Sequence, residues 1–81
     1  MYYAYVIKSL KDHSLYKGHC ENIELRMTQH NNGSTRSIAN KIPFELVYFE
    51  EFKAREDAIK REKYFKNAAG RKFIKQKLSL T

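Results

Sequence analysis

The N-terminal part of the chain reads as a β-hairpin, and this pattern limits the chain to folds built around an antiparallel sheet. Residues 2–8 are rich in aromatic and β-branched side chains, which favour a strand. A second short strand is predicted over residues 15–19, and the polar residues at 12–14 suit the turn between them. The residues that share one face of the first strand by the period-two rule are Tyr3, Tyr5 and Ile7, with Ala4 and Val6 on the other face.

The middle of the chain predicts a helix, a polar segment and a third strand. Asn22 is a suitable N-cap, and a helix runs from it to about His30. Residues 33–42 are polar and read as a loop or a short helix. Pro43 lacks an N–H group, which suits the start of a strand, and residues 44–50 continue that strand.

The C-terminal part predicts two more helices. A helix that begins near Ala54 turns one stripe of residues inward: Ala58, Ile59, Glu62 and Phe65. A shorter helix is expected after Gly70. The order β-β-α-β-α-α predicts an α+β fold, in which a small three-stranded antiparallel sheet is flanked by helices. With 81 residues, the whole chain (1–81) is expected to form a single domain with one modest core.

Positive charge is concentrated in the C-terminal part of the chain. Residues 1–52 hold six basic and six acidic residues, so they are neutral overall. Residues 53–81 hold ten basic and three acidic residues and carry the whole net charge of +7. This asymmetry favours a polyanionic partner, nucleic acid above all. The alternative is a solvated helical surface that aids solubility.

Several classes of protein and site do not fit the sequence. No apolar run approaches the roughly 18 residues of a membrane span, so no membrane partner is expected. The N-terminus also lacks the basic and apolar regions of a secretion signal. Cys20 is the only cysteine, so it forms no internal disulfide, and a reducing, cytoplasmic setting is expected. His13 and His19 lie near Cys20 but do not supply a set of three or four zinc ligands.

Five residues supply possible proton acceptors, cations for a phosphate and a carboxylate for a metal ion. They are Tyr5, Tyr16, Arg26, His30 and Glu62. The tyrosines offer proton acceptors, although a free tyrosine is a poor base near neutral pH. Arg26 and His30 lie one helical turn apart, so both can face one phosphate. Glu62 is a carboxylate on an otherwise apolar stripe, and one carboxylate with waters and substrate oxygens is typical of Mg²⁺ sites.

Each of these residues also has a structural explanation. Glu62 can form an ion pair with Lys66 at the i+4 position, worth about 0.3–0.5 kcal/mol. Arg26 can be an ordinary surface arginine, and His30 can interact with the dipole at the helix C-terminus. The tyrosines can be core aromatics of the hairpin, which for Tyr5 is as good an explanation as catalysis. The combination of all five is what favours a catalytic site.

The order and spacing of these residues resemble the GIY-YIG nuclease family over nearly the whole chain, and its small stand-alone branch in particular. The segments that carry the resemblance are Tyr3-Ala4-Tyr5, Tyr16-Lys17-Gly18, Arg26, His30, Pro43-Phe44-Glu45-Leu46-Val47-Tyr48, Glu62 and Gly70-Arg71-Lys72. The chain departs from the family pattern at Tyr3, Ala4 and Lys17, which are mainly strand-packing positions. A late asparagine of some relatives has no clear counterpart, Asn67 being a poor match. Gly18 is expected to allow a close approach of the backbone or a bulge.

The resemblance implies a metal-dependent endonuclease-like domain that hydrolyses phosphodiester bonds in DNA with little sequence specificity. Mg²⁺ or Mn²⁺ would be held by Glu62, and Arg26 would stabilise developing charge. Relatives favour Tyr16 as the base, with help from His30 or Tyr5. Residues expected to contact nucleic acid are Lys17, His19, Lys60, Lys63, Lys66, Arg71 and Lys72. No small-molecule cofactor is expected. The alternative is a non-catalytic nucleic-acid-binding module with a vestigial nuclease site.

Overall fold

The computed structural model describes residues 1–79, which form a three-stranded antiparallel sheet with helices. The strands are β1 (Tyr2–Ser9), β2 (Leu15–Cys20) and β3 (Phe44–Phe52). The helices are α1 (Ile23–Asn31), the 3-10 helix η1 (Arg36–Lys41), α2 (Arg55–Lys66) and α3 (Ala68–Ser79). The expected α+β class and order of elements are confirmed. Within residues 1–79, every helix is too short or too polar to serve as a membrane span.

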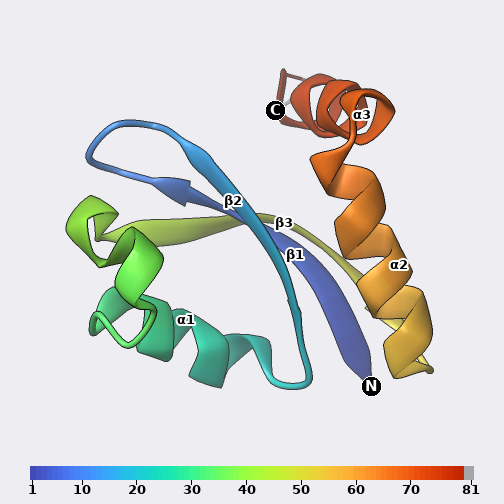
Figure 1. Cartoon of the computed structure of the whole chain (residues 1–81), viewed down its shortest axis with the longest axis horizontal. Helices are drawn as coiled ribbons and strands as arrows, with labels where there is room; N and C mark the ends of the chain where they lie inside the picture. Colours follow the sequence, from blue (N-terminus) through green and yellow to red (C-terminus); the bar gives the residue numbers. More distant parts are fainter. Residues whose placement is uncertain (80–81) are drawn as a thin grey trace.

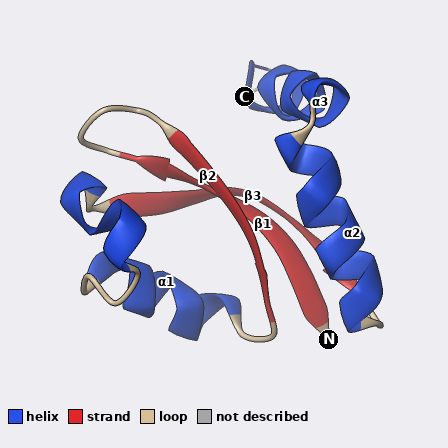
Figure 2. Ribbon diagram, in the orientation of Figure 1, coloured by secondary structure: helices blue, strands red, loops and turns tan. Residues whose placement is uncertain are grey.

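β1 lies at the centre of the sheet, between β2 and β3. α1 and η1 lie on one face of the sheet and α2 and α3 on the other (Figures 1 and 2). The apolar cluster under α2 and α3 is centred on Ala4, Val6, Phe65 and Ile74. The cluster under α1 and η1 is centred on Tyr5, Ile7, Ile38 and Phe44. The predicted alternation along the first strand is therefore confirmed. The prediction of one core is wrong, because the sheet is covered on both faces and divides the buried side chains.

α3 begins earlier than the sequence indicated. The prediction of a helix after Gly70 is wrong, since the helix begins at Ala68 and includes Gly70. Asn67 explains the earlier start, because its side-chain oxygen accepts a hydrogen bond of 2.8 Å from the N–H of Gly70 and caps the helix. A Cβ atom at Gly70 would lie 1.6 Å from the carbonyl oxygen of Tyr64. The absence of a side chain there lets α3 follow α2 almost directly.

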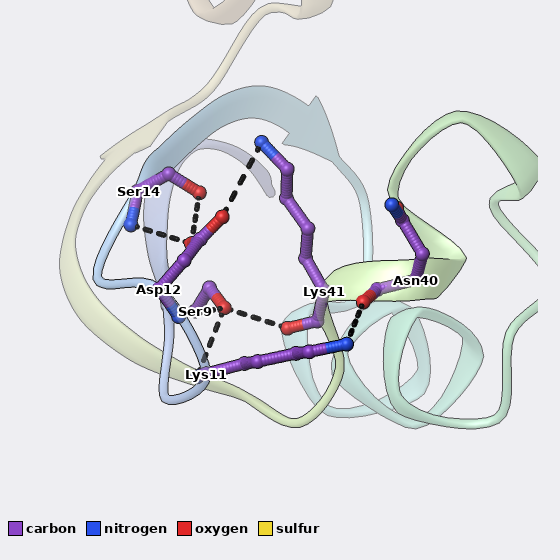
Figure 3. Close-up of polar contacts among 6 residues, drawn as sticks. All are labelled: Ser9, Lys11, Asp12, Ser14, Asn40 and Lys41. Atoms are coloured by element: carbon purple, nitrogen blue, oxygen red, sulfur yellow. Dashed lines mark hydrogen bonds and ion pairs between the residues drawn. The ribbon is translucent and has the colours of Figure 1, made fainter.

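The loop between β1 and β2 holds η1 in place (Figure 3). Ser9 is buried, and its hydroxyl donates to the carbonyl oxygen of Lys41 at 2.7 Å while accepting from the N–H groups of Lys11 and Asp12. The Asp12 carboxylate accepts hydrogen bonds from the hydroxyl and the N–H of Ser14, and these bonds lower its pKa to about 2. The expected turn at residues 12–14 is present, and the same loop ties η1 to the hairpin.

The Gly70→Ala variant is expected to lose about 1–3 kcal/mol of unfolding free energy, the usual cost of overpacking, although alanine is the better helix former. The added methyl group would meet backbone, which cannot rotate away. Urea unfolding followed by circular dichroism measures the loss. Lys72→Ala, an exposed change on the same helix, is the control and is expected to change stability by less than about 0.5 kcal/mol. Equal stabilities of the two variants would contradict the close junction of α2 and α3.

Candidate active site

Tyr5, His30 and Arg26 form a hydrogen-bonded cluster between the sheet and α1. The Tyr5 hydroxyl oxygen lies 2.8 Å from Nε2 of His30 and 3.4 Å from Nε of Arg26. Nε of Arg26 can only donate, so the Tyr5 oxygen accepts this bond. Among residues 1–79, His30 is the one partner that can accept the phenolic proton. The hydrogen bonds therefore run from Arg26 through Tyr5 to His30.

His30 is buried more deeply than the sequence suggested. Its second ring nitrogen, Nδ1, lies 3.0 Å from the hydroxyl of Thr35, and the residue is fully buried. Because Tyr5 donates to Nε2, the ring proton lies on Nδ1 and is donated to Thr35. Burial, with the positive charge of Arg26, lowers the pKa of His30 and keeps the ring neutral. The structure thus gives His30 a positioning contact to Tyr5 in place of the expected contact to water or phosphate.

Gly18 makes room for the Tyr5 hydroxyl. The two residues are partners in the β1–β2 pair, and a Cβ atom at Gly18 would lie 2.5 Å from the Tyr5 hydroxyl oxygen. Of the two roles that the sequence left open for this glycine, the structure shows the close approach. The register shift of β1 lies on its other side, against β3, between Val6 and Ile7.

The two tyrosines of the site differ in their surroundings. Tyr5 is 2% exposed, and burial raises its pKa to about 12 in spite of the hydrogen bond from Arg26. It is therefore a poor proton acceptor. Tyr16 lies on the same face of the sheet, half-buried, with its ring centroid 5.5 Å from that of His30. Its hydroxyl makes no hydrogen bond to any other residue in the described part of the chain, so it is available to a ligand.

Arg26 is held by α1 with its guanidinium group partly exposed. The helix begins after Asn22, whose side chain accepts a hydrogen bond of 3.0 Å from the N–H of Leu25, as the N-cap prediction requires. Nη1 of Arg26 donates to the side chain of Gln29 at 3.1 Å, and Nε donates to Tyr5. The bond to Tyr5 raises the pKa of Arg26 further. Nη2 has no partner within residues 1–79, so an arginine oriented at two nitrogens keeps one for a phosphate oxygen.

Glu62 belongs to a second cluster, on the face of β2 that α2 covers. Its carboxylate oxygens accept hydrogen bonds of 2.6 Å from Nδ1 of His19 and 2.7 Å from Nζ of Lys66. Burial by itself would raise the pKa of Glu62, but the bonds from Lys66 and His19 outweigh it and lower the pKa. The ion pair with Lys66 that the structural explanation requires is present. His19 is a second partner that the sequence did not indicate.

The two clusters meet at the end of β2, an edge strand of the sheet. Side chains of a strand alternate between faces, so Gly18 faces the cluster of Tyr5 and His19 faces that of Glu62. No hydrogen bond or ion pair in the described residues joins Glu62 to the tyrosines or to Arg26. A surface cavity of about 260 Å³ nevertheless spans both sides, lined by Tyr2, His19, Cys20, Glu21, Arg26 and Arg55. A ligand in this cavity would contact Arg26 on one side and the partner of Glu62 on the other.

Arg55 is a candidate that the sequence interpretation missed. It is the first residue of α2, its guanidinium carbon lies 5.2 Å from the ring centroid of Tyr2, and its Nη2 lies 4.0 Å from the Glu21 carboxylate. The signal that could have found it is its position two helical turns before Glu62, because residues i and i+7 share one face of a helix.

The residues expected to contact nucleic acid do not form one group. Lys66 and His19 hold Glu62, and Lys17 and Arg71 line a hollow between β2 and α3. The remaining residues of the expected set are exposed on helix surfaces and make no ion pair within residues 1–79: Lys60, Lys63 and Lys72. The structure therefore links part of the expected set to Glu62, part to the hollow between β2 and α3, and leaves three lysines apart from both.

The family of GIY-YIG catalytic domains matches this chain over residues 1–77. The chain belongs to the GIY-YIG family. It is 39% identical over 75 residues to a UPF0213 protein of Staphylococcus saprophyticus, which is 91% of this chain and 90% of that protein. A UPF0213 protein of Clostridium perfringens is 43% identical over 67 residues, 82% of this chain and 71% of that protein. A UPF0213 protein of Haloquadratum walsbyi is 34% identical over 67 residues, 82% of this chain and 74% of that protein. No solved structure matches.

As a GIY-YIG protein, the chain has a domain of nuclease type, which implies a nucleic acid substrate. GIY-YIG nucleases generally use divalent metal ions. The predicted family, and its small single-domain branch, are confirmed. In this GIY-YIG domain the two tyrosine motifs fall on β1 and β2, Arg26 and His30 fall on α1, and Glu62 falls on α2.

The free energy of unfolding is expected to decrease as the pH is lowered below about 6.5, because of His30. Burial holds the pKa of His30 below its ordinary value of 6.5. On acidification the unfolded chain therefore binds a proton that the folded chain does not bind, and unfolding becomes more favourable. Urea unfolding at a pH of about 7 and about 5.5 should show a larger loss for the wild type than for His30→Gln, which does not titrate.

The control for this measurement is His13→Asn, a change in the exposed loop between β1 and β2 at a residue whose φ of 65° asparagine tolerates. This variant should keep the pH dependence of the wild type. An unchanged pH dependence in His30→Gln would contradict a buried, neutral His30.

Proposed function

We propose that this chain is a metal-dependent endonuclease that hydrolyses phosphodiester bonds in DNA with little sequence specificity. The observation that carries the proposal is the cavity at the end of β2, which Arg26 and His19 line together. Arg26 belongs to the cluster of Tyr5, and His19 holds the carboxylate of Glu62. A phosphate in the cavity would therefore lie between the guanidinium group of Arg26 and the side of the site that holds the Glu62 carboxylate.

Glu62 is the residue that would hold the metal ion. Within residues 1–79, no group of three or more His, Cys, Asp or Glu side chains could hold one together. One carboxylate still fits Mg²⁺ or Mn²⁺, since Mg²⁺ usually keeps several waters and is bound by one or two carboxylates with substrate phosphates. Lys66 would have to release one oxygen, and its side chain is 53% exposed and free to move into solvent. The ion would neutralise negative charge on the scissile phosphate.

The other residues would divide the hydrolysis between them. Tyr16, whose hydroxyl has no partner in residues 1–79, would first lose its phenolic proton to solvent, and its phenolate oxygen would then receive the proton of the attacking water. Arg26 would donate from Nη2 to the phosphate oxygens, which gain charge as the water oxygen bonds to phosphorus and the bond to the leaving oxygen breaks. Tyr5 and His30 would keep Arg26 in place and would not touch the substrate.

The contacts proposed here are to phosphates, which carry no sequence information, so little specificity for bases is expected. DNA is the proposed nucleic acid, and the cytoplasm, where a lone Cys20 stays reduced, is the proposed setting. The alternative function is a non-catalytic nucleic-acid-binding module. It is favoured by one observation, that both oxygens of Glu62 are already engaged by His19 and Lys66.

The Glu62→Gln variant is expected to lose metal-dependent cleavage while it keeps its fold and its binding to DNA. An amide can retain hydrogen bonds to its neighbours but has no charge to hold a divalent ion, and surface ion pairs of this kind contribute less than about 1 kcal/mol. A plasmid-nicking assay with Mg²⁺ or Mn²⁺ and thermal unfolding on the same sample test both parts. Glu56→Gln, an exposed change in the first turn of the same helix, is the control and should cleave normally. Undiminished nicking by well-folded Glu62→Gln would show that Glu62 does not hold the catalytic metal ion.

Tyr16→Phe is expected to lose cleavage activity, whereas Tyr5→Phe is expected to lose stability. Loss of the Tyr16 hydroxyl breaks no hydrogen bond in the described structure, so cleavage should fall with little change in stability. Loss of the Tyr5 hydroxyl leaves Nε2 of His30 buried without a partner, which should cost about 1–3 kcal/mol. Melting temperatures and single-turnover cleavage rates compare the two variants. If Tyr16→Phe cleaves at the wild-type rate, Tyr16 does not receive the proton.

A further inference from the structure

A hollow of about 500 Å³ lies between β2 and α3, outside the catalytic cluster. Its floor includes the apolar side chains of Leu15 and Ile74, and the cationic residues Lys17, Arg71 and Lys75 also line it. Residues 71, 74 and 75 fall on one face of α3 by the 3–4 periodicity of a helix. The hollow is therefore apolar at its base and positive around it, which a site for phosphate alone does not require.

The hollow lies on the same face of β2 as the Glu62 cluster. Leu15, Lys17 and His19 lie on the same face of β2, because alternate residues of a strand share a face. Burial lowers the pKa of Lys17, and the positive charges of Arg71 and then Lys66 lower it further, so these cations lie near one another. Lys66 and His19 in turn hold Glu62. One face of β2 thus leads from the apolar hollow, past Glu62, to the cavity of Arg26.

The cations and the apolar floor along this face of β2 indicate which kind of ligand it can bind. Its cations attract phosphates, whereas the apolar floor of Leu15 and Ile74 gains only from burying an apolar surface such as the flat face of a nucleobase. In a duplex that face is stacked between neighbours and cannot enter a hollow. A strand with an unpaired nucleotide presents the phosphate and the base face together.

We propose that this face of β2 is the path of one nucleic-acid strand, with an unpaired base in the hollow between β2 and α3 and the scissile phosphate at the cavity of Arg26. The inference rests on the proposed nuclease function for the location of the cut, and it names the substrate class. The preferred substrates are single strands, or duplexes with an unpaired strand on the α3 side of the cut.

The test is binding without divalent metal, so that no cleavage takes place. Fluorescence anisotropy of the wild-type protein in EDTA compares a labelled single strand of about 12 nucleotides with the blunt duplex of the same sequence. Charge alone favours the duplex, since each phosphate contact contributes a salt slope of about −0.9 in B-DNA and about −0.7 in single strands. We expect the opposite order, with the single strand bound at least about fivefold more tightly. Equal or tighter binding of the duplex would overturn the proposal.

Two controls separate the base from the phosphates. An abasic strand of the same length and charge should bind about as weakly as the duplex, because nothing then fills the hollow. Arg71→Ala should weaken binding of the single strand about three- to tenfold, while Arg36→Ala, an exposed arginine on the η1 side, should leave it unchanged. Equal binding of abasic and normal strands, or equal effects of the two arginine variants, would also overturn the proposal. If the single strand is preferred in EDTA but no strand is cut when Mg²⁺ or Mn²⁺ is added, the nuclease function is removed and this path is kept.

Discussion

The site depends on one buried contact, the hydrogen bond between the Tyr5 hydroxyl and His30 above Gly18. It joins the central strand to α1, and it has space only because position 18 carries no side chain. The same hydroxyl accepts a hydrogen bond from Arg26, so the position of this arginine depends on how α1 packs. Since the Tyr5 oxygen and the His30 ring are both buried, an unpaired group at either position would be costly. The buried bond between Tyr5 and His30 therefore supports the partly buried bond that orients Arg26.

The arrangement of strands decides where the chemistry can take place. β1 is flanked on both edges and buried on both faces from Ala4 to Ile7, so these residues can position other groups but are shielded from a substrate. β2 has an open edge, and its side chains alternate between the cluster of Tyr5 and that of Glu62. The two halves of the site therefore face opposite sides of one strand and meet only at its end, where the cavity beside Arg26 and Arg55 lies.

At Glu62 the structural explanation is confirmed, and the catalytic explanation stays a prediction that is compatible with it. The ion pair with Lys66 is present, as the structural explanation requires, and His19 adds a second bond. Two cationic or proton-donating partners keep a partly buried carboxylate ionised, and ionised is also the form that binds a metal. In the proposed mechanism, metal binding and the ion pair compete for the same oxygens.

The sequence alone determined the local elements and the set of residues, because both follow from short-range patterns. Period two gave the faces of the hairpin, Asn22 gave the start of α1, and the spacing from Tyr5 to Glu62 gave the family. It did not determine that the core is divided, that α3 begins at Ala68, or that His30 is buried and Arg55 shares a cavity with Arg26. These features depend on which faces of the sheet the helices cover and how closely α2 and α3 approach at Gly70. Only the tertiary structure decides them, because they arise from contacts between residues far apart in the chain, which no local pattern encodes.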